Sequence, residues 1–244
     1  MSTALICIYS VTAVSVLVPL ILFIIWKAKS KAAFWSFIVG ALTFVLFALG
    51  AEQIANYFVL ADSNPVSAFI ASNRIYTIIY TALAAGFIEE LGRFISFKLL
   101  LCRRKDIKEG VAFGIGYAGI QMLLTVALFY VVLLLFNLGV MGFDAEISGL
   151  LKEVTASLNP VECGITLLES VSFLIFNIGA SMFVFKAAKN RKCGYFWLMG
   201  LAHTAMLLFS EFCANGTLPF WALPAWELIC GLAVIIDATR ICKN

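Results

Sequence analysis

Long apolar runs alternate with short polar connections along this chain of 244 residues. Most runs reach twenty residues or more, which suits helices that cross a hydrocarbon layer of about 30 Å better than the roughly ten-residue alternating strands of a membrane barrel. The pattern therefore predicts an all-α, polytopic membrane helix bundle of about seven transmembrane helices. The predicted spans are Ala4–Trp26, Phe34–Leu60, Ile75–Leu101, Gly110–Leu138, Gly164–Phe185, Tyr195–Cys213 and Phe220–Thr239.

Basic residues gather in every second connection and predict how the spans are oriented. Clusters stand at Lys27–Lys31, Arg103–Lys108 and Lys186–Lys192, and Arg240 and Lys243 close the last run. The intervening connections are acidic or neutral. Because cytoplasmic loops of membrane proteins carry an excess of Lys and Arg, we expect the C-terminus in the cytoplasm and the N-terminus outside.

Composition agrees with a membrane protein. Hydrophobic residues make up 63% of the chain and charged residues 13%, whereas soluble domains are roughly 45–50% apolar and 25% charged. We expect one integral membrane domain over residues 1–244, in contact with membrane lipids and with its first apolar run retained as a helix. The longest connection, Gly139–Cys163, has room for a short interfacial helix around Ala145–Leu151. The net charge of +3 gives no indication of nucleic-acid binding.

Polar residues interrupt the apolar runs at similar depth. Glu89 and Glu90 lie about 18–20 Å from the basic edge of the third run, counted at about 1.5 Å per helical residue. The same count places five further polar residues about 14–20 Å from the basic edges of their own runs, namely Tyr117, Gln121, Asn177, His203 and Glu227. We therefore expect polar groups from five helices to meet near the bilayer centre.

Two interpretations of Glu89, Glu90 and Arg93 follow from their spacing. Each ionised residue at the centre of a membrane helix costs on the order of 2.5–3.5 kcal/mol, so the charges need compensation. Arg93 stands four residues after Glu89 and three after Glu90, which places its guanidinium within reach of either carboxylate. The group could be a buried salt bridge that joins helices. Alternatively, one carboxylate could act as a general base or a metal ligand.

Four segments resemble a known family. They are EELGR at residues 89–93, GVAFGIGYAGIQ at 110–121, LESVSFLIFNIGAS at 168–181 and LAHTAMLL at 201–208. Together they resemble the YhfC family of intramembrane metalloproteases, which is similar to the CAAX-processing and bacteriocin-processing membrane proteases. The resemblance implies a metal-dependent endopeptidase in the bacterial cell membrane, acting on a transmembrane peptide or protein substrate. It implies Glu89, Glu90 and Arg93 as catalytic residues and zinc as cofactor.

The metal ligands follow from the same resemblance, which is incomplete. It implies His203 and Glu89 as metal ligands. Tyr117, Gln121, Asn177 and Glu227 are expected from their depth to line the site. Tyr117 and Asn177, however, stand where the family pattern has histidines, while Gln121 and Leu207 stand at acidic positions. The chain has one histidine in total, and a catalytic zinc ordinarily has about three protein ligands.

Three hypotheses are therefore compatible with the sequence. The first is an intramembrane endopeptidase with water activated by Glu89 or Glu90. The second is a catalytically inactive relative that binds a membrane partner through the same groove. The third is a proton-linked transporter, suggested by carboxylates such as Glu227 at membrane depth. For His203 a structural role, hydrogen bonding to Asn177 or Tyr117, is the alternative to metal binding.

Overall fold

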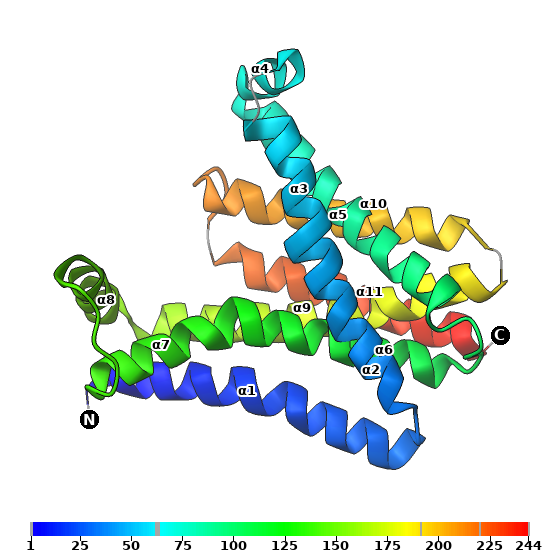
Figure 1. Cartoon of the computed structure of the whole chain (residues 1–244), viewed down its shortest axis with the longest axis horizontal. Coiled ribbons are helices and arrows are strands. Elements are labelled where there is room, and N and C mark those ends of the chain that lie inside the picture. Colours follow the sequence, from blue (N-terminus) through cyan, green and yellow to red (C-terminus); the bar gives the residue numbers. More distant parts are fainter. Residues whose placement is uncertain (1, 62–63, 191, 220, 244) are drawn as a thin grey trace.

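A computed structural model describes residues 2–61, 64–190, 192–219 and 221–243, and the described part is a bundle of helices without strands. The N- and C-terminal ends lie at opposite ends of this bundle (Figure 1). The connections that carry the basic clusters lie at the same end as the C-terminus (Figure 1), which agrees with their predicted exposure to one side of the membrane. The prediction of an all-α membrane bundle is confirmed.

The helices follow the predicted spans closely. In chain order they are α1 (Thr3–Ser30), α2 (Phe34–Thr43), η1 (Phe44–Ala51), α3 (Glu52–Asn56), η2 (Tyr57–Ala61), α4 (Pro65–Ala71), α5 (Arg74–Leu99), α6 (Ile107–Met122), η3 (Leu123–Ala127), α7 (Leu128–Asn137), α8 (Ala145–Ser157), α9 (Pro160–Asn190), α10 (Gly194–Ala214) and α11 (Ala222–Lys243). The short helix expected around Ala145–Leu151 is present as the longer α8. Its interfacial position stays a prediction. The predicted start of the last span, Phe220, lies outside the described residues.

Six helical stretches of the described chain are long and apolar enough to cross a membrane. Helix α5 corresponds to the third predicted span. It is 26 residues long but is not among these six. It carries Glu89, Glu90 and Arg93, which interrupt its apolar sequence. A total of seven spans therefore stays a prediction, as does the side of the membrane that each end faces.

Two of the long stretches contain π-helical turns. The residues from Phe34 to Ala61 form one continuous helical stretch in which η1 and η2 alternate with α2 and α3, and η3 links α6 to α7 in the same way. A π-turn accommodates one extra residue per turn and is often found at functional sites. Here η1 packs on α5, where a Cβ at Gly92 would come within 2.4 Å of the Phe47 ring.

Local capping fixes several helix ends. The side chain of Asp106 accepts a hydrogen bond from the Lys108 amide at the start of α6, and Asp144 does the same for the Ile147 amide in α8. At the C-terminal end of α5, the Lys189 ammonium donates to the Phe97 and Leu101 carbonyls at 2.8 and 2.6 Å. These contacts satisfy backbone groups that helix ends leave unpaired.

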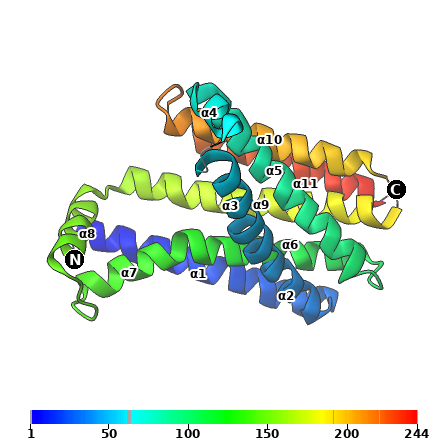
Figure 2. The ribbon, with the colours of Figure 1, turned by 45° about the horizontal axis from the view of Figure 1, so that its top comes forward.

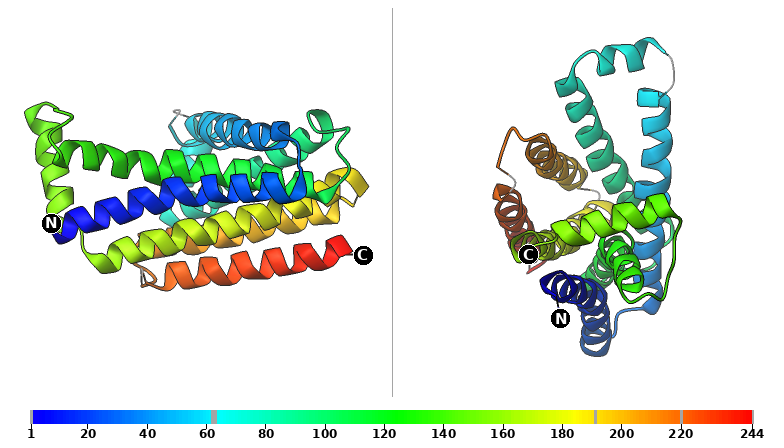
Figure 3. Two further views of the ribbon diagram at one scale, coloured as in Figure 1. Left: turned by 90° about the horizontal axis from the view of Figure 1, so that it is seen from below. Right: turned by 90° about the vertical axis from the view of Figure 1, so that its left-hand side faces the viewer.

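The long helix α9 forms the centre of the bundle. It packs against α11, α6, α5, α10 and α1, as Figures 2 and 3 show from three further directions. Small residues allow these approaches: a Cβ at Gly114 would lie 2.8 Å from the Ile178 Cα, and one at Gly179 would lie 3.0 Å from the Ile235 amide nitrogen. Close backbone approach of this kind is typical of helix packing in membranes.

Two peripheral features complete the fold. The Glu109 carboxylate of α6 accepts hydrogen bonds from the Ala33 amide at 3.1 Å and the Ser36 hydroxyl at 2.5 Å, which fastens the start of α2 to α6. At the end near the N-terminus, α8 runs across the bundle (Figure 3). Helix α4, with the adjoining ends of its neighbours, projects from the side of the bundle (Figures 1 and 3). The polar site described next lies in the packed part, between α5, α6, α9 and α10.

Candidate functional site

Glu90 of α5 lies at the centre of a buried polar network. Its Oε1 accepts a hydrogen bond from the Arg93 guanidinium and lies 3.0 Å from the Nδ1 of His203 on α10. The side chains of all three residues are completely enclosed. Because Arg93 follows Glu90 by one helical turn, the pair forms within α5, while the imidazole is contributed by the neighbouring helix.

The second arm of Arg93 extends the network to two more helices. Its Nη2 donates to the Oδ1 of Asn177 on α9. The Asn177 amide nitrogen in turn donates to the Oε1 of Gln121 on α6 and to the Phe173 carbonyl, both at 2.9 Å. Four helices are thus joined by a continuous chain of side-chain hydrogen bonds.

Glu89 occupies a more accessible position beside this chain. Its residue surface is 7% exposed, whereas Glu90 is fully enclosed. The Oε2 of Glu89 accepts a hydrogen bond of 2.5 Å from the Tyr117 hydroxyl, and lies 3.7 Å from the Nη2 of Arg93 and 4.0 Å from the Nε2 of His203. The Arg93 guanidinium also lies 4.0 Å above the Tyr117 ring, a cation–π arrangement.

The sequence explains why the two adjacent glutamates have different partners. Neighbouring residues on a helix point about 100° apart, so Glu90 faces α10 while Glu89 faces α6. Helix α10 comes close because Gly86 leaves room: a Cβ there would lie 2.8 Å from the Thr204 amide nitrogen. The fully enclosed Phe176 of α9 packs against the imidazole, with its ring 5.1 Å from the His203 ring.

Arg93 compensates the charge of Glu90, but the network leaves some hydrogen-bonding capacity unused. An ion pair in a low-dielectric interior is tolerated when its remaining donors and acceptors find partners. Among the described residues, the Oε2 of Glu90, the Nε of Arg93 and the Nε2 of His203 have no such partner. Buried polar atoms are rarely left this way, so the centre of the site can accept further hydrogen bonds from a bound water or ligand.

A catalytic zinc does not fit this set of donors. The described part of the chain contains no group of three His, Cys, Asp or Glu residues placed to hold a metal ion. Glu89 and His203, the two ligands that the family resemblance implies, are fewer than the three protein ligands that a catalytic zinc ordinarily has. The positive charge of Arg93, 3.7 Å from the Glu89 Oε2, also opposes a second cation at that position.

Most of the predicted site residues are brought together, with two differences. Glu89, Glu90, Arg93, Tyr117, Gln121, Asn177 and His203 belong to the network just described. His203 contacts Glu90, and no hydrogen bond to Asn177 or Tyr117 is present in the described chain. Glu227 of α11 makes no ion pair with Arg93, so the network joins four helices and not the expected five.

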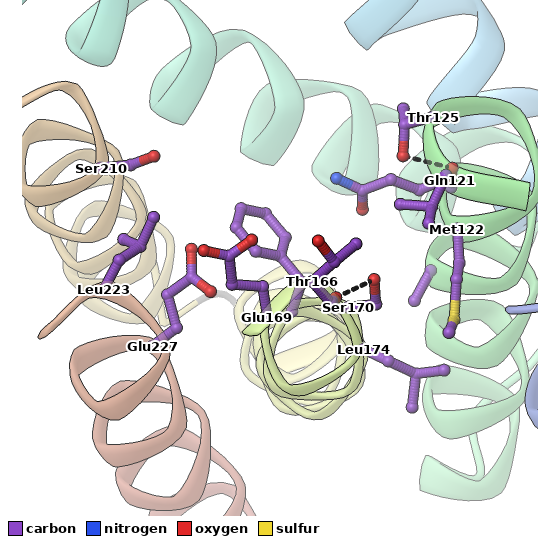
Figure 4. Close-up of a pocket in the computed structure, with 13 residues that line it drawn as sticks. Gln121, Met122, Thr125, Thr166, Glu169, Ser170, Leu174, Ser210, Leu223 and Glu227 are labelled. Atoms are coloured by element: carbon purple, nitrogen blue, oxygen red, sulfur yellow. Dashed lines mark hydrogen bonds between the residues drawn. The ribbon is translucent and has the colours of Figure 1, made fainter. Parts of the chain in front are cut away.

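Glu227 instead lines a neighbouring cavity. This cavity has a volume of about 310 Å³ and lies between α6, α9, α10 and α11 (Figure 4). Glu169 of α9 lines the same cavity, together with Gln121 and Ser210. The sequence did not indicate that Glu169 and Glu227 line one cavity, because distance along a helix does not tell which neighbouring helix a side chain faces.

Comparison with known proteins gives the relationship of the chain. A family described as YhfC intramembrane metalloprotease matches residues 14–228. The uncharacterised membrane protein YhfC of Bacillus subtilis (strain 168) is 28% identical over 190 residues, which cover 74% of this chain and 73% of that protein. No solved structure matches the chain.

Proposed function

Since the chain belongs to the family of YhfC intramembrane metalloproteases, we propose that it hydrolyses a peptide bond of a membrane polypeptide with the Glu89 carboxylate as general base. The family name implies a metal, but the donors around Glu89 do not fit a catalytic zinc. The proposed reaction therefore uses the side chains of the chain itself. The protein is an integral membrane protein, and its proposed substrate is a transmembrane peptide or protein.

One observation carries this proposal: the Oε2 of Glu89 lies close to three other polar groups. Tyr117, Arg93 and His203 surround it at 2.5, 3.7 and 4.0 Å. Glu89 is also less enclosed than Glu90, which is fixed by Arg93 and His203. The two adjacent carboxylates would thus have different roles. Glu90 stabilises the network, and Glu89 contacts the water and the substrate.

The proposed reaction balances with these groups alone. Glu89 takes a proton from a water molecule, whose oxygen forms a bond to the carbonyl carbon of the substrate. The hydroxyl of Tyr117, which donates to Glu89 in the resting protein, is released when that carboxylate is protonated and can donate to the developing oxyanion. The carbon–nitrogen bond then breaks, and the leaving amine takes the proton back from Glu89.

Reconstituted protein with a fluorogenic transmembrane peptide library tests the proposal. Removal of a general base ordinarily lowers a rate by 10²- to 10⁴-fold, so we expect a loss of roughly that size in Glu89→Gln. Glu211→Gln is the matched control, because Glu211 lies on α10 outside the network. Treatment with a zinc chelator should leave the rate unchanged. Undiminished cleavage by Glu89→Gln, or loss of cleavage on chelation that zinc restores, would contradict the proposal.

A second candidate function is supported by the same incomplete donor set. The protein would then be a catalytically inactive relative that holds a membrane partner against the polar network. In that case crosslinking to the partner in native membranes should survive Glu89→Gln and His203→Ala, and no product should depend on either residue. A cleavage product that disappears in Glu89→Gln would exclude this candidate.

A further inference from the structure

The cavity beside the polar network contains two acidic side chains that the proposed reaction does not use. Glu169 comes from α9 and Glu227 from the first half of α11. Figure 4 shows their carboxylates directed toward each other across the cavity. Both lie among apolar side chains of the same cavity, such as Leu174 and Leu223.

Neither carboxylate is compensated within the described chain. Glu227 is 2% exposed, and its Oε2 is enclosed without a hydrogen-bond partner. The Oε1 of Glu169 is also enclosed and without a partner. No ion pair of the described residues includes either glutamate. Buried carboxylates are ordinarily paired, because an isolated charge in a low-dielectric environment is strongly unfavourable.

The shape and lining of the cavity indicate what kind of cation would compensate them. A volume of about 310 Å³ is at the lower end of the range for small-molecule sites, roughly 300–1,000 Å³, and exceeds what one bare ion fills. Apolar side chains from three helices, including Phe173, Leu174 and Leu223, can cover an aliphatic stem. Long cationic side chains combine such a stem with a charged head group.

We propose that this cavity binds an aliphatic ammonium group between Glu169 and Glu227. An ammonium has three donors, and the two carboxylates with the Ser210 hydroxyl provide acceptors around the cavity. The charge of the nearby network does not oppose this, because Arg93 is already paired with Glu90 and separated from the cavity by Asn177 and Gln121.

The position of the cavity points to a source for this group. Gln121 belongs to both sites: its Oε1 accepts from Asn177 in the network, and the residue lines the cavity. Because Gln121 borders both sites, a polypeptide with a lysine side chain in the cavity would pass next to the polar network that contains Glu89. We infer that the substrate is a membrane segment with a lysine next to the cleaved bond, a step that rests on the proposed function.

Binding of the ammonium can be measured without hydrolysis. Full-length protein carrying Glu89→Gln is reconstituted in nanodiscs and titrated with n-pentylamine, with 1-pentanol as the neutral probe, by calorimetry. We expect binding of the amine alone, weakened at least tenfold by Glu227→Gln and by Glu169→Gln and unchanged by Glu211→Gln. Equal binding of the alcohol, or amine binding that is indifferent to Glu227→Gln, would overturn the proposal. Displacement of the amine by an equal concentration of sodium would also overturn it in favour of an inorganic ion.

The stability of the empty protein is an independent readout. If Glu227 lacks a partner, Glu227→Gln should raise the thermal midpoint of the unliganded protein, and pentylamine should raise the midpoint only when Glu227 is present. A lower midpoint in Glu227→Gln would show that the carboxylate already has a stabilising partner, which contradicts the proposal.

The source of the ammonium is tested by cleavage. Matched transmembrane peptides carry either lysine or norleucine next to the scissile bond. In the unmodified protein we expect kcat/KM for the lysine peptide to be at least tenfold higher than for the norleucine peptide. In Glu227→Gln we expect a much smaller ratio. If no peptide is cleaved while pentylamine still binds, the proposed function fails and the ammonium site stands. If peptides are cleaved without preference for lysine, the assignment of the substrate fails alone.

Discussion

The charge of Arg93 should be required for folding, because two buried carboxylates depend on it. Its guanidinium pairs with Glu90, lies 3.7 Å from Glu89 and donates to Asn177. Arg93→Met keeps much of the side-chain volume but leaves these partners uncompensated. Removing one member of a buried ion pair costs about 3–5 kcal/mol, which corresponds to a decrease of roughly a hundredfold to several thousandfold in the ratio of folded to unfolded protein.

A matched control exists at the end of α11. Arg240 and Asp237 form an ion pair with the same three-residue spacing as Arg93 and Glu90, but their side chains are 75% and 58% exposed while those of the buried pair are 0% exposed. Exposed pairs contribute about 0–1 kcal/mol. Arg240→Met should therefore change the free energy of unfolding far less than Arg93→Met does.

The measurement is reversible denaturation of purified protein in mixed micelles, followed by circular dichroism. A double variant, Glu90→Gln with Arg93→Met, removes a buried charge together with its partner and should recover at least half of the loss, because coupled residues give non-additive effects. The reasoning is refuted if Arg93→Met and Arg240→Met differ by less than about 1 kcal/mol, the range of an exposed pair. It is also refuted if the double variant is as unstable as the sum of its single changes.

Three further predictions concern positions around the network. Tyr117→Phe removes the donor to Glu89 and should lower kcat by about 10²- to 10³-fold, as loss of an oxyanion donor does; an unchanged kcat in the peptide assay would exclude that role. Gly86→Ala places a Cβ within 2.8 Å of the Thr204 amide nitrogen and should destabilise the protein by about 1–3 kcal/mol. Gly164 has open space around it, so Gly164→Ala should not destabilise the protein. Equal denaturation curves for the two variants would contradict this prediction. Glu109→Ala leaves the Ser36 hydroxyl and Ala33 amide without their acceptor and should cost about 1–3 kcal/mol; amide hydrogen exchange at the start of α2 should rise, and unaltered exchange would count against it.

The helices were predictable because their signal is local. Apolar runs closed by basic clusters gave the spans to within a few residues, and the depth of charged residues inside those runs drew attention to Glu89, Glu90 and Arg93. Geometry within one helix also gave the ion pair of Arg93, since residues three and four apart lie on one face.

The remaining features depend on contacts between helices. The π-helical turns of η1 fall in a uniformly apolar sequence, FVLFALGA, that gives no local signal for an extra residue per turn. Depth alone placed Glu227 with the network. The rotation of α9 and α11 about their axes decides instead that Glu169 and Glu227 face one cavity, and sequence depth carries no information on rotation.

The hydrogen bonds of Glu109 have a consequence for biosynthesis. The acceptor that fixes the start of α2 is 73 residues further along the chain than Ser36 and 76 further than Ala33. The carboxylate that accepts these hydrogen bonds is therefore synthesised later than both α1 and α2. The start of α2 can reach its final position against α6 only after α6 itself has been synthesised.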